Sequence, residues 1–314
     1  MSLAKNPWPR WATASCAAAS AALLMALFLT QCTTRAEAQN RRIVAAGGVI
    51  TEIAYALGRQ DWLVGVDSTS QFPPEALKNK PNIGYVRALS AEGLLSLKPD
   101  RVIAIEGAGP PDVIKLVDQA KVPVRFIPED YSEAGVVRRI FMVGQELEAV
   151  AAAEALAHRV KLGFEKLAAA RLAAGQPARV LFVLSLQNGR VMVGGRNTSA
   201  DAIIRLAGGE NAASTVDGFK PLSDEGIIAA APDVVILMKR GEHALSASEL
   251  FSHPAFQLVP AARTQALVAM DGLYLLGFGP RTPDAAIELM GEIRRVRSAV
   301  PERRAAYPQT TPAR

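Results

Sequence analysis

The most constraining feature of this sequence is an internal repeat of seventeen residues. The segment 89–105 reads LSAEGLLSLKPDRVIAI, the segment 222–238 reads LSDEGIIAAAPDVVILM, and eight of the seventeen aligned pairs are identical. The spacing between the copies is too large for a solenoid and instead predicts two homologous lobes. Because small-molecule sites often lie at domain interfaces, two lobes also predict a ligand cleft between them.

Each copy of the repeat predicts a short helix, a sharp turn and a strand. Ser90 and Ser223 are each followed two residues later by a glutamate, Glu92 and Glu225, which is typical of a helix N-terminus. A Pro-Asp pair ends each helix, and the apolar run that follows is typical of a buried parallel strand. The remaining predicted elements are strands at 43–46, 62–66, 124–127 and 180–184, helices at 51–57 and 111–119, and a hairpin at 187–193.

This alternation predicts an α/β protein whose two homologous lobes each have a parallel central sheet flanked by helices. The stretch between the lobes is rich in Ala, Glu, Lys, Arg and Leu and has no proline, which predicts one long linking α-helix, or a helix with a bend. The predicted organisation is a signal peptide at 1–38, an N-terminal lobe at 39–131, a linking helix at 132–175, a C-terminal lobe at 176–300 and a flexible tail at 301–314.

The N-terminus has the pattern of a secretory signal. Lys5 and Arg10 precede an alanine-rich apolar stretch at 12–30, and an Ala-Glu-Ala sequence predicts cleavage near Ala38-Gln39. A retained membrane helix is a weaker alternative, because a true anchor needs a longer and more strongly apolar stretch. A lipid anchor at Cys32 is disfavoured, because a glutamine stands before it where a small residue is expected.

The composition of the chain argues against several kinds of site and partner. Both cysteines, Cys16 and Cys32, lie within the predicted signal, so the mature chain would have no thiol for a disulfide or a thiolate-bound metal. The formal charge of +5 falls to about +3 when three basic residues and one acidic residue of the signal leave. With so mild a charge and no basic stripe interleaved with aromatic residues, we expect no nucleic-acid partner.

The sequence favours a binding protein over an enzyme. It contains no Gly-x-Ser-x-Gly elbow, P-loop or dinucleotide fingerprint, and nothing in it pairs a nucleophile with a base. The three histidines, His158, His243 and His253, do not have the spacing of metal ligands, and we expect them at the surface.

Tyr85 and Arg87, in a loop that begins with Gly84, are the candidate functional residues that remain. In one interpretation, the tyrosine packs on the edge of its lobe and the arginine is a solvated charge. In the other, the Tyr85 phenolate is a hard anionic ligand that suits Fe(III), and tyrosine does serve as an axial ligand of haem iron. An arginine two residues further on would then donate to the phenolate oxygen and favour its ionised form.

Several segments resemble the periplasmic haem-binding proteins of bacterial haem ABC importers, and the match covers nearly all of the mature chain. The Gly-Tyr-x-Arg segment and the DGLYLLGFGPRT segment are its most specific parts. The wider fold is that of the helix-linked class of substrate-binding proteins, which also carries cobalamin and siderophores. The segments that carry the resemblance are 43–53, 67–70, 84–93, 195–201 and 271–282.

The resemblance implies iron acquisition in the periplasm. The ligand would be haem, as Fe(III) protoporphyrin IX, carried as cargo and not used as a catalytic cofactor. The partner would be an ABC permease dimer with its ATPase subunits at the inner membrane, and we expect the binding protein itself to be a monomer. A cobalamin or ferric-siderophore carrier of the same fold is the alternative, and it would bind its ligand without ligation of iron by Tyr85.

The resemblance assigns haem-binding roles to particular residues. Tyr85 would be the axial ligand of the haem iron, and Arg87 would correspond to the family's arginine beside that tyrosine. Arg240 would reach the haem from the second lobe, although it is alternatively a solvated loop charge. Two further arginines are weaker candidates for haem contacts, Arg196 and Arg281.

The resemblance also assigns a role to the repeated glutamates, and the sequence departs from the family at one position that bears on the number of bound haems. Glu92 and Glu225 match the pair that docks each lobe onto arginines of the permease, and they also suit the N-terminal ends of their helices. Some relatives carry a histidine in a Leu-Ser-His stretch and use it on a second haem, but here the stretch 184–189 reads LSLQNG. We therefore predict one haem per chain, five-coordinate through Tyr85 or with a weak sixth ligand.

Overall fold

The computed structural model describes residues 41–173, 175–187, 189–239 and 246–298. The fold described below is that of the unit that begins at Arg42. The predicted signal peptide at 1–38, the tail at 301–314, and the residues Arg240 and His243 lie outside the described residues. Within the described part of the chain, no helix is both long and apolar enough to span a membrane.

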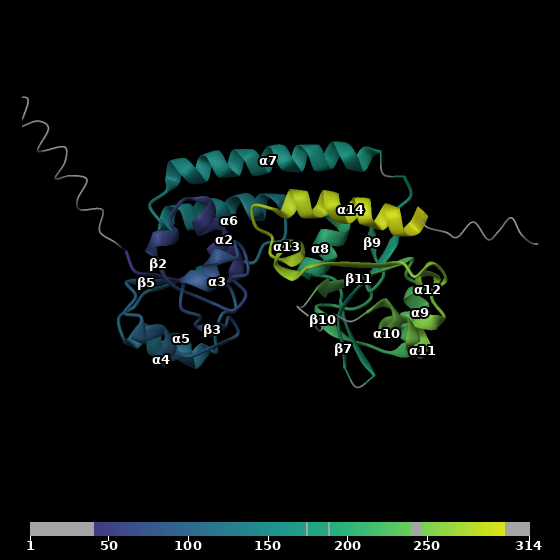
Figure 1. The fold of residues 1–314 in the computed structure, drawn as a ribbon, viewed down its shortest axis with the longest axis horizontal. Helices are drawn as coiled ribbons and strands as arrows, with labels where there is room; N and C mark the ends of the chain where they lie inside the picture. Colours follow the sequence, from purple (N-terminus) through teal and green to yellow (C-terminus); the bar gives the residue numbers. More distant parts are fainter. Residues whose placement is uncertain (1–40, 174, 188, 240–245, 299–314) are drawn as a thin grey trace, which may run out of the picture. The chain divides into compact units, whose positions relative to one another are not determined.

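The first lobe is built on a four-stranded sheet in which every strand pair is parallel, in the order β2-β1-β5-β6 (Figure 1). A separate two-stranded hairpin carries the predicted tyrosine. The strands are β1 Ile43–Ala46, β2 Leu63–Val66, β3 Gly84–Tyr85, β4 Ala88–Leu89, β5 Arg101–Ile105 and β6 Val124–Ile127; the helices are α2 Gly48–Ala56, the 3-10 turn η1 Gln60–Trp62, α3 Glu75–Asn79, α4 Ala91–Ser96 and α5 Pro111–Gln119.

The second lobe has the same parallel core and two additional antiparallel strands. Strands β9, β7, β11 and β12 pair in parallel and form the predicted parallel core, and β8 and β10 add to its edge in antiparallel pairing. The strands are β7 Arg179–Gln187, β8 Arg190–Gly194, β9 Glu210–Asn211, β10 Phe219–Leu222, β11 Val234–Lys239 and β12 Leu267–Asp271; the helices are α8 Ser199–Leu206, α9 Asp224–Ala230, α10 Ala247–Ser252, α11 Pro254–Gln257, α12 Pro260–Thr264, α13 Gly272–Leu276 and α14 Thr282–Ser298.

The mixed sheet has a local cause. The predicted hairpin forms, and it joins β7 to β8 around Gly189, which adopts a left-handed φ of 72°. A hairpin of this kind can only pair its strands in antiparallel fashion, and β10 then continues the sheet from β8.

The sequence repeat is a structural repeat, as predicted. The hydroxyl of Ser90 accepts a hydrogen bond from the backbone N–H three residues on at 3.3 Å, and Ser223 does the same at 3.2 Å. Both short helices are followed by a left-handed residue at the same place, Lys98 with φ 45° and Ala231 with φ 41°. The two copies therefore enter and leave their helices in the same way.

The aspartates of the repeated Pro-Asp pairs attach each copy to the residue at or just before the start of the first strand of its lobe. Asp100 accepts a hydrogen bond from the backbone N–H of Arg42 at 2.8 Å, and its own N–H donates to the Arg42 carbonyl at 2.7 Å. Asp233 makes the same two bonds with Arg179, at 2.9 and 2.8 Å. Both arginine side chains then donate to carbonyls at the end of the repeated helix.

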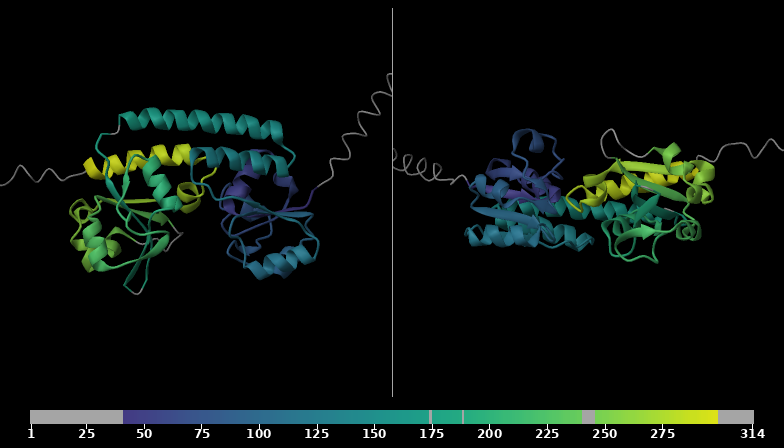
Figure 2. Two further views of the ribbon diagram at one scale, coloured as in Figure 1. Left: turned by 180° about the vertical axis from the view of Figure 1, so that it is seen from behind. Right: turned by 90° about the horizontal axis from the view of Figure 1, so that it is seen from below.

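The linking segment forms two helices, where its composition predicts one long helix or a helix with a bend. Helix α6 spans Glu133–Glu146, helix α7 spans Val150–Leu172, and Glu148 between them adopts a left-handed φ of 50°. A Cβ on Gly144 would lie 2.4 Å from the Cβ of Ala153, so glycine allows α7 to fold back closely over α6. Figures 1 and 2 show α7 running beside α6 and then beside α14 of the second lobe.

Burial explains why the strands read as continuous apolar runs. Along β1, Ile43 and Ala45 face the large hydrophobic core, whereas Val44 and Ala46 face a smaller core on the opposite side of the sheet. Both faces of the first sheet are therefore covered, as expected for parallel strands between helices. The large core is continuous through the linking helices into the second lobe.

Candidate functional site

Tyr85 lies on a hairpin that is held by the loops around it. The carbonyl of Gly84 accepts a hydrogen bond from the Ser68 N–H at 2.8 Å, in the loop after β2. On the other side, Gly109, in the loop after β5, donates to the Val86 carbonyl at 3.0 Å and accepts from the Leu89 N–H at 2.8 Å. The Tyr85 side chain remains 53% exposed on this fixed support, which leaves its phenol available to a ligand.

Arg87 is held by other residues of the first lobe. Its guanidinium donates to the Glu106 carbonyl at 2.7 Å and forms an ion pair with Glu129 at 3.3 Å. A Cβ on Gly107 would lie 1.9 Å from the Arg87 Nη1, so the arginine lies over a position that only glycine can occupy. Among the described residues, its hydrogen bonds go to these two glutamates and not to the Tyr85 phenol that we expected it to contact.

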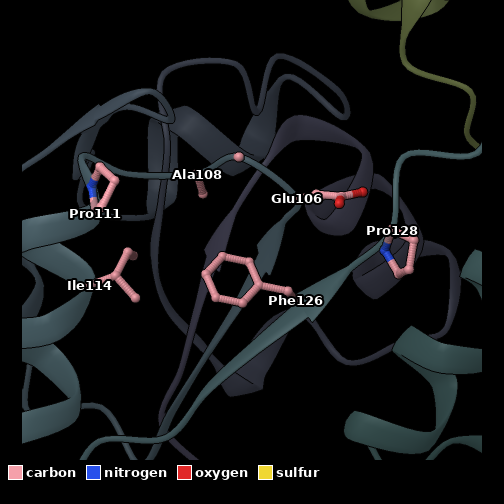
Figure 3. Close-up of a pocket in the computed structure, with 7 residues that line it drawn as sticks. Glu106, Ala108, Pro111, Ile114, Phe126 and Pro128 are labelled. Carbon is pink, nitrogen blue, oxygen red and sulfur yellow. The ribbon is translucent and has the colours of Figure 1, made fainter.

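A pocket of about 480 Å³ is lined in part by Glu106 and Gly107, the two residues against which the Arg87 guanidinium lies; Glu106 is labelled in Figure 3. This volume is within the range of small-molecule sites. Figure 3 shows the ring of Phe126 and the side chain of Ile114 bordering one space, with Glu106 near its edge. Its lining is mostly apolar and comes from the ends of β5 and β6 and the start of α5: Glu106, Gly107, Ala108, Pro111, Ile114, Phe126 and Pro128.

The Asp-Ser-Thr-Ser segment has a structural role. The Asp67 carboxylate is fully buried, and it accepts a hydrogen bond from the Gly47 N–H at 2.9 Å. It also accepts from the Thr69 hydroxyl at 2.6 Å and the Ser70 hydroxyl at 3.0 Å. These bonds tie the loop after β2 to the loop after β1, and the first of these two loops also holds the Tyr85 hairpin.

Arg281, a weaker candidate for a haem contact, lies at a junction between the two lobes. It pairs with the buried Glu52 of α2 at 2.9 Å. Its guanidinium also lies 3.6 Å from the ring centre of Phe72 in the first lobe and 5.0 Å from that of Tyr274 in the second. The DGLYLLGFGPRT segment therefore contacts the first lobe through its arginine.

Arg139 is a second connection between the lobes, and it was not apparent in the sequence. It is 3% exposed on α6 and donates to the carbonyls of Pro128 at 3.0 Å, Gly277 at 3.2 Å and Phe278 at 2.6 Å. Phe278 also packs edge-to-face against Tyr131 with ring centres 5.1 Å apart. Nothing in the local sequence separates Arg139 from Arg138, its exposed neighbour, because only the tertiary contacts distinguish them.

Three other tyrosines of the described chain are less suited to bind a metal. Burial, together with Glu129, raises the pKa of Tyr131 to about 12, and burial, together with Glu288, raises the pKa of Tyr274 to about 12. Burial also raises the pKa of Tyr55. Because the phenolate is the form that binds Fe(III), these environments oppose ligation, whereas Tyr85 is the exposed tyrosine on the fixed hairpin.

Glu92 and Glu225 occupy equivalent exposed positions on the two lobes. Each is the second residue of its short helix, α4 or α9, two residues after the capping serine. The backbone N–H of Glu225 and the Ser223 hydroxyl donate to the Glu225 carboxylate and hold its pKa below the ordinary value. Each lobe thus presents one carboxylate at the same point of the repeat.

The remaining candidates are dispersed. Arg196 is exposed in the loop between β8 and α8, and Arg240 lies outside the described residues. His253 is not at the surface as expected, because its side chain is only 12% exposed and packs on Phe256. Within the described ranges, no group of His, Cys, Asp and Glu side chains is arranged to hold a metal ion.

The chain belongs to the periplasmic binding protein family, whose model matches residues 43–273. Its structure is similar to that of the periplasmic heme-binding protein BhuT, solved in complex with two hemes, with 41% identity and a TM-score of 0.77. That similarity covers 83% of this chain and 99% of BhuT.

Curated relatives are more distant in sequence. The vitamin B12-binding protein of Vibrio parahaemolyticus is 26% identical over 259 residues, which are 82% of this chain and 90% of that protein. An uncharacterized ABC transporter substrate-binding lipoprotein of Bacillus subtilis, YvrC, is 26% identical over 201 residues, and the chain spans 63% of its length. One of these relatives is thus named as a substrate-binding protein of an ABC transporter, and the family to which this chain belongs is one of periplasmic binding proteins.

Proposed function

We propose that this protein captures ferric haem in the periplasm and delivers it to an ABC permease with its ATPase subunits at the inner membrane. The observation that carries the proposal is Tyr85, a half-exposed tyrosine on a hairpin fixed from both sides. A phenolate there is a suitable hard ligand for Fe(III), and Arg87 supplies positive charge to the same surface. The likeness to BhuT, at 41% identity, supports haem as the ligand.

The positive charges fit the two carboxylates of a haem. Arg87 is held over Gly107 by Glu106, while Arg196 is exposed on the second lobe. We propose that Arg87 and Arg240 contribute affinity through the haem propionates, since an arginine does not give up its proton and is a poor metal ligand. Arg281 contributes indirectly, because its guanidinium is paired with the buried Glu52, whereas Arg87 and its partner Glu129 are both more exposed.

We propose one haem per chain. The stretch 184–189 of the second lobe has no histidine to ligate a further iron. Since BhuT was solved with two hemes, the stoichiometry is a direct test of this point. A hemin titration should break at one equivalent per chain, and a break at two equivalents or a spectrum with a nitrogen ligand would contradict it.

The second candidate is cobalamin, because several curated relatives are vitamin B12-binding proteins. The two functions differ in Tyr85. A corrinoid or a siderophore would not need ligation by the phenolate, whereas ferric haem bound through it has charge-transfer features in its absorption spectrum. The purified mature chain should therefore be titrated with hemin, cobalamin and a ferric siderophore in parallel.

Replacement of the proposed ligand tests the haem function. Tyr85→Ala should weaken hemin binding at least tenfold, which is about 1.4 kcal/mol, and should remove the phenolate charge-transfer features. Tyr55→Ala, at a tyrosine whose pKa is raised by burial, is the matched control and should leave both unchanged. Unchanged affinity and spectrum in Tyr85→Ala, or tight binding of cobalamin in place of hemin, would end the proposal.

A further inference from the structure

The structural repeat identifies a counterpart of Tyr85 in the second lobe. Tyr85 directly follows Gly84, which has a left-handed φ of 94°, and precedes the repeated leucine Leu89 by four residues. Phe219 directly follows Gly218, with φ 76°, and lies three residues ahead of the equivalent leucine. Because the helices after these leucines have the same serine cap and the strands the same register, each aromatic residue stands shortly before the same repeated element of its lobe, with a difference of one residue in spacing.

Phe219 is exposed but rigidly supported. Its side chain is 38% exposed at the edge strand β10. Behind it, the ring of the fully buried Phe182 packs edge-to-face with ring centres 6.3 Å apart. A Cβ on Gly194 would lie 3.2 Å from the Phe219 Cε1, so this glycine leaves room for the ring to lie against the strand. One face of the ring is therefore fixed and the rest is free for a partner.

The loop before Phe219 is also fixed, and it brings a cation close. Gly218 donates to the Arg196 carbonyl at 2.9 Å, and its own carbonyl accepts from the Gly195 N–H at 3.0 Å. Asn197 donates to Asp217 at 2.6 Å across the same two segments. Arg196 and Phe219, which are far apart in the sequence, thus belong to one ordered surface with an aromatic ring and a guanidinium.

We propose that Phe219 stacks on the face of the haem opposite Tyr85 and closes that face without ligating the iron. The inference rests on the proposed function, which it deepens by naming a contact from the second lobe. A phenyl ring has no donor atom for a metal, but its face stacks favourably on a flat aromatic ligand. The duplicated position therefore supplies iron ligation from one lobe and stacking from the other, which leaves the iron five-coordinate.

The test separates stacking from ligation by comparing hemin with metal-free protoporphyrin IX, which has the same ring and no iron. In the mature chain, Phe219→Ala should weaken binding of both ligands about tenfold, while the Tyr85 charge-transfer features of the hemin complex persist. Tyr85→Phe should weaken hemin alone. Phe219→Trp should retain affinity for both ligands within about threefold, because it keeps an aromatic face.

Two further variants serve as controls for the test of Phe219. Phe219→Leu keeps the apolar bulk without the aromatic face and should weaken both ligands, which keeps the test valid if the alanine variant does not fold. Leu258→Ala, at an apolar residue of the second lobe that is 67% exposed, should bind as the wild type does. If Phe219→Ala and Phe219→Leu bind both ligands normally while Tyr85→Phe loses hemin, the stacking role is overturned and the haem function stands. If the wild type binds neither ligand, both proposals fail.

Discussion

The two copies of the repeat have the same internal bonds but differ in the residues just before them. In both lobes a serine caps the helix, and an aspartate binds the residue at the start of the first strand. Ahead of the helix, the first lobe turns back in the β3–β4 hairpin, whereas the second lobe continues as β10 along the edge of its sheet. Each lobe therefore carries one aromatic residue shortly before the repeat, a phenol on the hairpin of the first lobe and a phenyl ring on the edge strand of the second.

The largest expected effect is a loss of haem uptake when the two equivalent glutamates of the repeat are replaced. A double change of Glu92 and Glu225 to alanine should reduce haem uptake in a reconstituted importer by more than tenfold, because one carboxylate per lobe would meet the two related permease subunits. Hemin affinity should stay unchanged. The wild-type interaction should also weaken with added salt, since both charges are exposed.

The matched control for the docking glutamates is Glu133→Ala. Glu133 is also exposed in the first turn of a helix and follows a capping serine, Ser132, but it lies on α6 outside the repeat. Its replacement should leave uptake normal. Normal uptake by the double variant, or equal loss in the control, would remove the docking role and leave the glutamates as helix N-terminal residues.

The next effect concerns the junction where the lobes meet. Glu52→Ala should lower the free energy of unfolding by about 3 kcal/mol, because it leaves the half-buried Arg281 guanidinium without its carboxylate. Urea denaturation followed by circular dichroism measures this loss. Glu292→Ala, which breaks an exposed pair with Arg295, should cost less than about 0.5 kcal/mol.

A double variant sharpens the test of that junction. Replacing both Glu52 and Arg281 by methionine should recover much of the stability lost in Glu52→Ala, because no unpaired charge remains. If Glu52→Ala were as stable as the wild type, the pair would not hold the lobes together. The connection would then depend on Arg139 and its three carbonyl acceptors.

A smaller effect tests whether the repeat is energetically symmetric. Asp100→Ala and Asp233→Ala should each lower the free energy of unfolding by about 1 kcal/mol, because each removes one hydrogen bond to the backbone of the first strand. Asp118→Ala, at an exposed position on α5, should change it by less than about 0.5 kcal/mol. Costs that differ between the two aspartates by more than about 1 kcal/mol would show that the copies are alike in geometry but not in energy.

The smallest effect is seen at high pH. The pKa of Tyr131 is raised to about 12, mainly by burial and then by Glu129. Since the folded pKa is above the ordinary value of about 10, the stability from the neutral phenol is fully present below pH ~10. It is lost as the pH rises towards about 12.

The phenolate absorbance of the folded protein, followed on raising the pH, measures this directly. Tyr131→Phe should remove one late-titrating group, while Tyr274, whose pKa is also about 12, remains. A Tyr131 that ionises near pH ~10 in the folded protein would show that this phenol is open to water.

Much of the first lobe was predictable from local pattern. The strands 43–46 and 124–127 and the helix 111–119 were predicted with their observed bounds, because apolar runs between Gly and Pro residues have few other solutions. Helix α2 begins at Gly48, earlier than the predicted Thr51, whose hydroxyl instead bonds Ser70. A side chain that pairs with a distant loop gives no local sign of it.

The sequence by itself determined the duplication, the capped helices of the repeat, and the choice of Tyr85 with the two glutamates as candidate residues. The duplication and the helix caps depend on contacts between residues near in the chain, which spacing and residue type reveal, whereas the choice of Tyr85 and the glutamates rests on the resemblance to a known family. Only the tertiary structure decided that the linker folds back at Gly144, that Arg281 pairs with Glu52 across the lobes, and that Arg139 is buried beside an exposed Arg138. The physical reason is that these features depend on which surfaces meet after folding, and residues with the same local sequence signals then have different partners.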